Sequence, residues 1–217
     1  TLGVGMISPA AAFSSMFSTF ALSGVIGYQV VWGVVPALHS PLMAVTNAIS
    51  GMTAVGGMFA MGGGVLPTTT GETIAAAATG ISMINVTGGF LVTKKMLDLF
   101  KRPDDPPEFY EYYGVPVAGF TGGFMLANMM GMKEVSSIAA TASALCCIGG
   151  IAGLSTQATA RLGNISGMAG VTFGLVSAMG TLQFANPMAY MQLAGVLGGG
   201  GGLGVLIANR VDPTSLP

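Results

Sequence analysis

A single histidine stands out in a chain that is otherwise poor in titratable side chains. His39 is the only histidine, and it lies in an apolar stretch with the sequence PALHSPL. An imidazole takes up and releases a proton near neutral pH. In a membrane segment an ionisable side chain is rare and usually faces a cavity or a partner. His39 is therefore a candidate proton carrier, although a neutral histidine at the interfacial end of a helix remains the alternative.

Small polar residues follow His39 at helical spacing. On a helix that turns about 100° per residue, Thr46, Ser50 and Thr53 fall within about 40° of His39, and Asn47 lies beside them. Hydroxyl groups in line with a histidine could hold a chain of water molecules through a bilayer. The alternative is that they only join helices by hydrogen bonds, which is common in membranes.

A second polar stripe could face the first. It consists of Thr79, Ser82, Asn85, Gly89 and Thr93, which recur at spacings of three and four. A buried asparagine needs hydrogen-bond partners, so the Asn85 amide could face the histidine stripe or an adjacent water. Helix pairing is an equally open interpretation of Asn85. The predicted proton pathway is thus formed by His39, Thr46, Asn47, Ser50 and Asn85.

The elements that must position these residues are membrane helices. Only 7% of the 217 residues are charged, against about a quarter in soluble domains, and 52% are apolar. Such a chain cannot build a solvated surface, and lipid is the alternative solvent. The sequence therefore predicts an all-α membrane protein, a polytopic bundle of about seven transmembrane helices. The predicted spans are residues 9–28, 33–61, 73–99, 115–130, 135–154, 162–182 and 188–208.

Glycines recur within these apolar blocks. The chain has 35 of them, and several pair at a spacing of four, which is typical of closely packed membrane helices. The pairs are Gly119 and Gly123, Gly149 and Gly153, Gly163 and Gly167, Gly170 and Gly174, and Gly195 and Gly199. The run from 198 to 204 matches a dinucleotide fingerprint, but it follows no predicted strand, so close packing is the better interpretation. Cys146 and Cys147 are adjacent and are interpreted as packing residues.

Charged residues gather in one linker and at the ends of spans. Residues 101–114 form a polar linker between two membrane parts, residues 1–100 and 115–217. With seven spans, all basic residues except Lys133 fall on one side, which the positive-inside rule makes the cytoplasm or the mitochondrial matrix. The polar loop 155–161 faces this inner side. Arg161 and Asn164 could therefore form a coupling loop that contacts a soluble domain, with an ordinary connecting loop as the alternative.

Three long stretches resemble a known family, and they occur in the family's order. They are residues 31–51 (VWGVVPALHSPLMAVTNAISG), 88–103 (GGFLVTKKMLDLFKRP) and 153–164 (GLSTQATARLGN). Together they resemble the membrane domain of the proton-translocating NAD(P) transhydrogenases. The chain is similar to the second through eighth helices of that domain, preceded by the end of the first. The continuous linker resembles the mitochondrial fused type, because bacterial enzymes usually divide into subunits at this point.

The resemblance implies that the domain couples proton movement across the membrane to hydride transfer between NAD(H) and NADP(H). Both cofactors would be held in attached soluble domains, and none by this chain, which alone is expected to be neither a catalyst nor a complete channel. The implied partners are the NAD(H)-binding and NADP(H)-binding domains, the remaining membrane helices, the lipid bilayer and a second copy in a homodimer, but no nucleic acid. The implied location is the mitochondrial inner membrane, with the bacterial plasma membrane as the alternative.

Two other functions remain open from the residues alone. A small secondary transporter or channel without an enzymatic partner would bind a solute through polar residues near the middle of the membrane. A structural membrane subunit of a larger complex would have no transport role. Nucleotide-binding domains that co-purify with the chain would distinguish the transhydrogenase from both.

The charge asymmetry predicts that Thr1 lies outside and that the linker lies inside. A cysteine introduced at position 105, in a variant lacking Cys146 and Cys147, should react with an impermeant thiol reagent only from the inner face of sealed vesicles. Labelling from the outer face would mean that the topology is inverted or miscounted.

Overall fold

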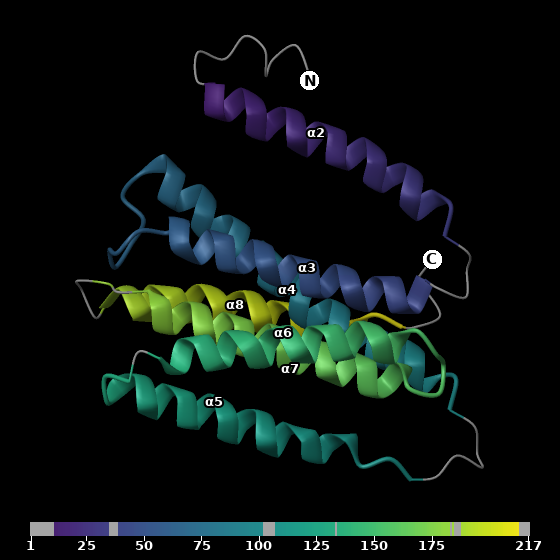
Figure 1. The fold of residues 1–217 in the computed structure, drawn as a ribbon. Helices are drawn as coiled ribbons and strands as arrows, with labels where there is room; N and C mark the ends of the chain where they lie inside the picture. Colours follow the sequence, from purple (N-terminus) through teal and green to yellow (C-terminus); the bar gives the residue numbers. More distant parts are fainter. Residues whose placement is uncertain are drawn as a thin grey trace. The chain divides into compact units, whose positions relative to one another are not determined.

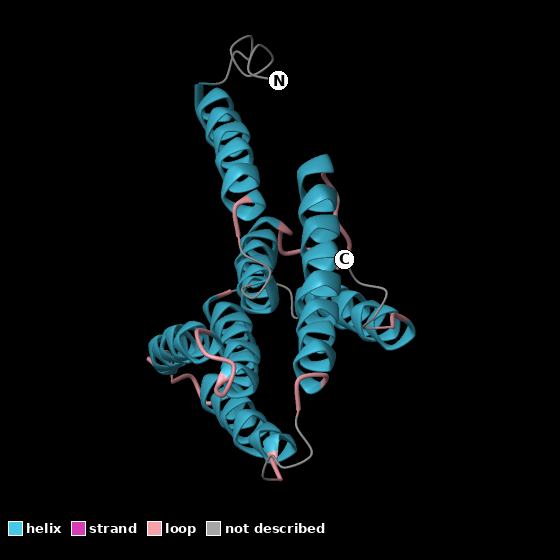
Figure 2. Ribbon diagram, turned by 90° about the vertical axis from the view of Figure 1, so that its right-hand side faces the viewer, coloured by secondary structure: helices cyan, strands magenta, loops and turns pink. Residues whose placement is uncertain are grey.

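The computed structural model describes residues 11–34, 39–101, 107–132, 134–182, 184 and 188–212, and the regular structure within them is helical (Figures 1 and 2). The prediction of an all-helical protein is confirmed. The α-helices are α2 (Ala11–Trp32), α3 (His39–Ala60), α4 (Thr70–Asp98), α5 (Gly114–Met129), α6 (Val135–Leu154), α7 (Ala160–Thr181) and α8 (Met188–Arg210), and a 3₁₀ helix, η2 (Tyr110–Tyr113), precedes α5.

The chain divides into two compact units. The first is residues 1–39 and contains α2, and the second is residues 40–217 and contains the bundle from α3 to α8. Each predicted span has a matching helix among the described residues. Position 105 and Lys133, which matter for the predicted topology, lie outside the described residues.

Five of the described helices are long and apolar enough to cross a membrane: residues 42–60 of α3, together with α4, α6, α7 and α8. Helix α5 has 16 residues, fewer than the about 20 that a hydrocarbon core requires, although η2 leads directly into it. Large apolar side chains such as Ile81, Ile148 and Leu206 are exposed on the spanning helices. This outward apolar surface is what a protein solvated by lipid requires.

A capping box fixes the beginning of α4. The Thr69 hydroxyl accepts a hydrogen bond from the Glu72 backbone N–H at 3.2 Å, and the Glu72 carboxylate accepts one from the Thr69 N–H at 3.3 Å. The carboxylate also accepts a hydrogen bond from the Thr68 N–H at 2.6 Å. The helix therefore begins at Thr70, slightly before the predicted span 73–99.

Two helix pairs are built on contacts between glycine backbones, and each pair lies side by side in Figure 1. Between α6 and α7, a Cβ atom added at Gly163 would lie 2.6 Å from the backbone nitrogen of Leu154 and 2.7 Å from the carbonyl oxygen of Gly150. Between α4 and α8, a Cβ atom added at Gly200 would lie 2.4 Å from the Gly80 carbonyl oxygen. Any side chain at these positions would push the helices apart.

Other predicted glycine pairs are not used in this way. Within the described chain no atom lies within 4 Å of a Cβ atom added at Gly119, Gly123 or Gly199. The predicted close contact at Gly199 is therefore wrong for the described part of the chain, where the neighbouring Gly200 makes the contact instead. Cys147 packs against Gly170 of α7, where an added Cβ atom would lie 2.5 Å from its sulfur, so its interpretation as a packing residue is confirmed.

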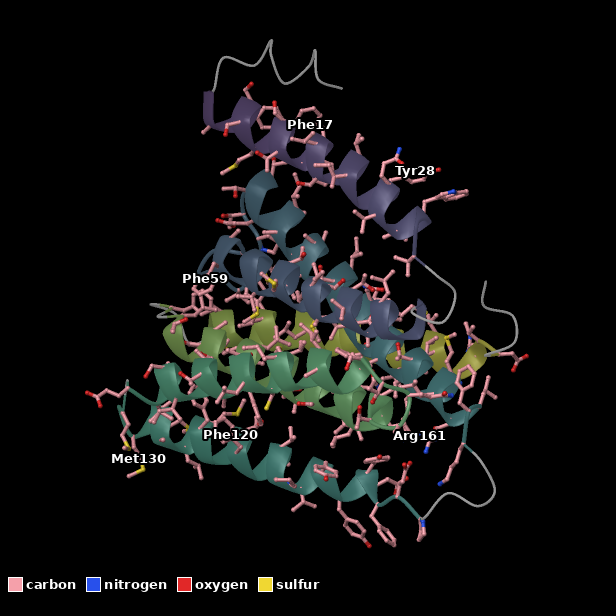
Figure 3. The ribbon with its side chains drawn as sticks, turned by 45° about the vertical axis from the view of Figure 1, so that its right-hand side comes forward. Phe17, Tyr28, Phe59, Phe120, Met130 and Arg161 are labelled. Carbon is pink, nitrogen blue, oxygen red and sulfur yellow. The ribbon has the colours of Figure 1, made fainter. Side chains whose placement is uncertain are left out.

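An apolar core connects four helices of the bundle. Its buried side chains include Met58 of α3, Phe90 of α4, Leu175 of α7 and Leu193 of α8. Helix α5 joins through a smaller cluster formed by Phe124, Ala139 and Val176. Phe120 of α5, labelled in Figure 3, packs against this cluster, and its ring centroid lies 4.4 Å from that of Phe173 in α7. The core therefore places α3, α4 and α7 against one another, and these three helices carry most of the predicted polar residues.

The glycine contacts generate a stability prediction. Gly163→Ala should destabilise the bundle by about 1–3 kcal/mol, because the new methyl group meets backbone atoms that cannot move aside. Gly199→Ala is the matched control, since the same change on α8 enters open space and alanine favours a helix by about 1 kcal/mol. Thermal unfolding of the purified protein in detergent should separate the two variants. Equal melting temperatures would contradict the proposed role of the α6–α7 contact.

Candidate functional site

Helices α3 and α4 contact each other through a few residues of the two predicted polar stripes and through glycines. The Asn85 side-chain amide donates a hydrogen bond to the Ser50 hydroxyl at 2.6 Å, and Ser50 donates to the Thr46 carbonyl oxygen at 3.2 Å. Further along, Gly57 lies against Thr79, and Asn47 lies against Gly89. Because the α4 residue number falls as the α3 number rises, the two helices are antiparallel and their register is fixed by these contacts.

The buried face of α3 is not the predicted one. The residues that point into the bundle are Ala44, Asn47, Gly51, Ala54 and Met58, at spacings of three and four. Thr46 and Thr53 are exposed, and the Thr46 hydroxyl donates to the carbonyl oxygen of Met43 in its own helix at 2.8 Å. The expected hydroxyl face therefore lies at the side of α3, because small residues and not hydroxyls define the face on which the helices pack.

Asn47 and Ser50 occupy different positions in the α3–α4 contact. Asn47 is 4% exposed, and its side-chain nitrogen has no hydrogen-bond partner within the part of the chain that the structure describes. Ser50 is half-buried, and its partner Asn85 is exposed, so this hydrogen bond lies at the edge of the contact. The structure thus brings Thr46, Ser50 and Asn85 into one hydrogen-bonded series and places Asn47 deeper, about one turn away.

His39 is the first residue of α3. Its side chain lies outside the described part of the structure, and its role as a proton carrier stays a prediction.

Arg161, the second residue of α7, connects three segments of the chain (Figure 3). Its guanidinium pairs with the Glu108 carboxylate of the linker and lies 3.8 Å from the Asp98 carboxylate at the end of α4. It also donates to the Leu97 carbonyl oxygen at 3.4 Å. A cation beside the last carbonyls of α4 interacts favourably with the helix dipole. Arg161 therefore holds the end of the linker against both helices.

The carboxylate partners of Arg161 were not identified from the sequence. Glu108 also accepts a hydrogen bond from Tyr110, and burial together with this bond raises the pKa of Tyr110 above its ordinary value. Lys95 donates to the Ala208 carbonyl oxygen at 2.7 Å and so joins the ends of α4 and α8. The only signal in the sequence was the concentration of charge near the linker, and it did not specify the partners.

Asn164 lies inside the bundle and not in a loop. It is 1% exposed, and its side-chain nitrogen lies 3.4 Å from the Phe90 carbonyl oxygen of α4. Helix α7 begins at Ala160, so Asn164 falls in its second turn. The two residues predicted for one coupling loop are therefore separated, with Arg161 at the linker and Asn164 in the helix core.

A polar pocket and an apolar groove lie near the residues described above. A polar pocket of about 470 Å³ beside Arg161 is lined by side chains of α4, the linker and η2, including Lys94, Lys101 and Glu108. An apolar groove of about 510 Å³ lies between α3, α6 and α7 and is lined mainly by small and aliphatic side chains. Among the described residues no three His, Cys, Asp or Glu side chains gather as a metal site requires. The glycine run from 198 to 204 is helical throughout.

The Arg161 contacts generate a further prediction. Arg161→Gln should destabilise the protein by about 1–3 kcal/mol, because the partly buried Glu108 carboxylate would lose its cation while the Asp98 carboxylate remains nearby. The linker should also be cleaved faster by proteases added to the inner face. Lys94→Gln is the matched control, since it removes one charge from an exposed position in α4. Unchanged melting temperature and cleavage rate in the Arg161 variant would contradict a structural role for this ion pair.

Comparisons with known proteins match both ends of the described bundle. Residues 16–102 match the family model described as the 4TM region of pyridine nucleotide transhydrogenase, and residues 136–217 match the model of the NAD(P) transhydrogenase beta subunit. Residues 103–135, which include most of the linker, η2 and α5, fall between the two matches.

Curated relatives agree with these models. The chain is 45% identical over 101 residues to the NAD(P) transhydrogenase subunit alpha of Cereibacter sphaeroides, covering 46% of this chain and 18% of that protein. It is 44% identical over 105 residues to the Haemophilus influenzae subunit alpha, covering 46% and 19%. In Rhodospirillum rubrum the subunit alpha is divided, and the chain is 42% identical over 93 residues to its second portion, covering 43% and 66%.

The chain spans less than a fifth of the length of the first two relatives. The two family models nevertheless cover its sequence on both sides of the linker, and they match the membrane-spanning helices. The chain belongs to the membrane domain of the NAD(P) transhydrogenase family.

Proposed function

We propose that the chain forms part of the proton pathway of a proton-translocating NAD(P) transhydrogenase. In this function, proton movement through the membrane helices is coupled to hydride transfer between NAD(H) and NADP(H) in soluble domains. Family membership supports the coupled reaction, and the observation that supports a pathway through this chain is the hydrogen bond between Asn85 and Ser50. It joins two membrane-spanning helices by polar groups at a depth where lipid offers no hydrogen bonds.

The proposed pathway uses His39 as the group that changes charge. An imidazole can take up and release a proton near neutral pH, which would allow His39 to exchange a proton with water. Along α3, the series from Asn85 through Ser50 to the Thr46 carbonyl oxygen supplies both donors and acceptors that can order water. Thr46, Asn47, Ser50 and Asn85 would stabilise such water without changing their own charge.

The soluble partners would be an NAD(H)-binding and an NADP(H)-binding domain of the same enzyme. Their docking would involve the inner end of the bundle, where Arg161 orders the end of the linker beside an open polar pocket. The complete membrane domain would include further helices, and a second copy would complete a homodimer. We propose the mitochondrial inner membrane as the location on the basis of the continuous linker. The bacterial plasma membrane is the alternative, and the bacterial relatives favour it.

A small secondary transporter or channel without an enzymatic partner would be a different function. The apolar groove between α3, α6 and α7 offers few polar groups to bind a solute, and the matched relatives are transhydrogenase subunits. No observation favours this alternative.

The test is His39→Ala in the complete enzyme, reconstituted in proteoliposomes. Proton pumping and proton-coupled transhydrogenation should be lost, because His39 is the only histidine of this chain. Binding of both nucleotides should persist, since their sites lie in other domains.

Thr53→Val is the matched control for His39→Ala. It removes one polar group from an exposed position of the same helix and should leave pumping unchanged. Pumping by His39→Ala at the wild-type rate would rule out a proton pathway through this residue.

A further inference from the structure

Three buried polar side chains from three helices lie around one turn of α4. Asn47 of α3 is 4% exposed, Thr93 of α4 is 0% exposed, and Asn164 of α7 is 1% exposed. The Asn47 amide lies against Gly89, the Asn164 nitrogen faces the Phe90 carbonyl oxygen, and Thr93 follows Gly89 by one turn. The three side chains are therefore placed around the same short piece of α4.

Each of these side chains has an atom that finds no hydrogen-bond partner among the described residues. The atoms are the Asn47 nitrogen, the Thr93 hydroxyl oxygen and the Asn164 oxygen. Buried polar atoms are usually paired, because an unpaired one loses its hydration without compensation. Three such atoms at one turn of a helix indicate a common partner.

Thr93 differs from other threonines of the same helix. The hydroxyls of Thr73, Thr79 and Thr87 each donate to the carbonyl oxygen four residues earlier, at distances of 2.8–3.0 Å. The Thr93 hydroxyl makes no such bond, although Gly89 precedes it by four residues. Its hydroxyl is therefore available to another group.

Gly89 makes room for this arrangement. A Cβ atom added at Gly89 would lie 2.0 Å from the Asn47 side-chain oxygen, so the amide occupies the space that any other residue would fill. The absence of a side chain at Gly89 thus allows Asn47 to reach α4 at the level of Phe90 and Thr93. The α3–α4 contact accommodates a polar group here and not an apolar one.

The unused atoms are complementary in hydrogen-bonding type. The Asn47 nitrogen is a donor, the Asn164 oxygen is an acceptor, and the Thr93 hydroxyl can be either. A water molecule accepts from the first, donates to the second and can exchange either role with the third, and buried waters in proteins typically make about three hydrogen bonds. We propose that Asn47, Thr93 and Asn164 form a binding site for ordered water within the membrane.

This site lies about one turn from the Ser50–Asn85 pair, in the direction of the C-terminal end of α4. Its use in transport rests on the proposed function. There, water held at this turn continues the polar route toward the end of α4 at which Arg161 orders the linker. Thr93 and Asn164 are then positioning residues of the proton pathway, and neither carries the proton itself.

The experiment compares Thr93→Val with two matched variants in the complete enzyme. Thr93→Ser keeps the hydroxyl. Thr79→Val makes the same change at another fully buried threonine of α4, whose hydroxyl donates to the Ala75 carbonyl oxygen. In wild-type enzyme labelled with ¹⁵N-asparagine, solid-state NMR should show contacts between water and the side-chain amides of Asn47 and Asn164. These contacts should be lost in Thr93→Val and kept in the other two variants.

The melting temperature tests whether the water site exists, and proton pumping tests whether the site is used in transport. Thr93→Val should lower the melting temperature, because it leaves Asn47 and Asn164 without their bridge, and pumping should be lost. Absence of water contacts in the wild type, or a higher melting temperature of Thr93→Val, overturns the site itself. Water contacts combined with wild-type pumping by Thr93→Val overturn only its place in the pathway. If His39→Ala also pumps normally, the proposed function fails while the water site stands.

Discussion

A lipid tail can neither donate nor accept a hydrogen bond, and this constraint governs the structure described here. The backbone meets it by forming helices. Threonine and serine hydroxyls meet it mostly by donating to a carbonyl oxygen of their own helix, as Thr79 and Thr87 do. Polar groups that are not satisfied in this way must find a partner on another helix or a water. They are the groups that join α3, α4 and α7, and they are the basis for assigning function to this part of the bundle.

Close packing in this bundle depends on the same constraint. Because lipid provides no hydrophobic driving force for helices to associate, helix backbones must approach closely enough for dispersion attraction and short hydrogen bonds to hold them together. Gly150 and Gly163 allow this between α6 and α7, where Ser166 donates to the Cys146 carbonyl oxygen at 2.8 Å. Gly200 and Gly204 allow it between α4 and α8, where Thr87 reaches the Gly201 carbonyl oxygen at 2.9 Å. Small residues and hydroxyls therefore act together at both contacts.

The sequence predicted the helices well and their contacts less well. The span 135–154 coincides with α6, because long apolar runs bounded by polar turns are a local signal. The capping box at Thr69 and Glu72 was also local, but it lies in a polar segment that is typical of a loop. The inward face of α3 could not be found by following hydroxyls, since Ala44, Gly51 and Ala54 define it. The Ser50–Asn85 bond and the Arg161–Glu108 pair depend on the register between distant segments, which no spacing within one helix specifies.

The contacts of α4 bear on how such a protein can be encoded. Helix α4 precedes the linker in the chain, yet it packs against α7 and α8, which follow the linker. In addition, Arg161 of α7 binds Asp98, which precedes the linker, and Glu108, which lies within it. Non-covalent contacts therefore hold together the helices before and after the linker, in addition to the covalent connection through the linker. These contacts would also be available to two halves that are not covalently joined through the linker. One gene or two could encode the same bundle, provided that both products insert into the same membrane.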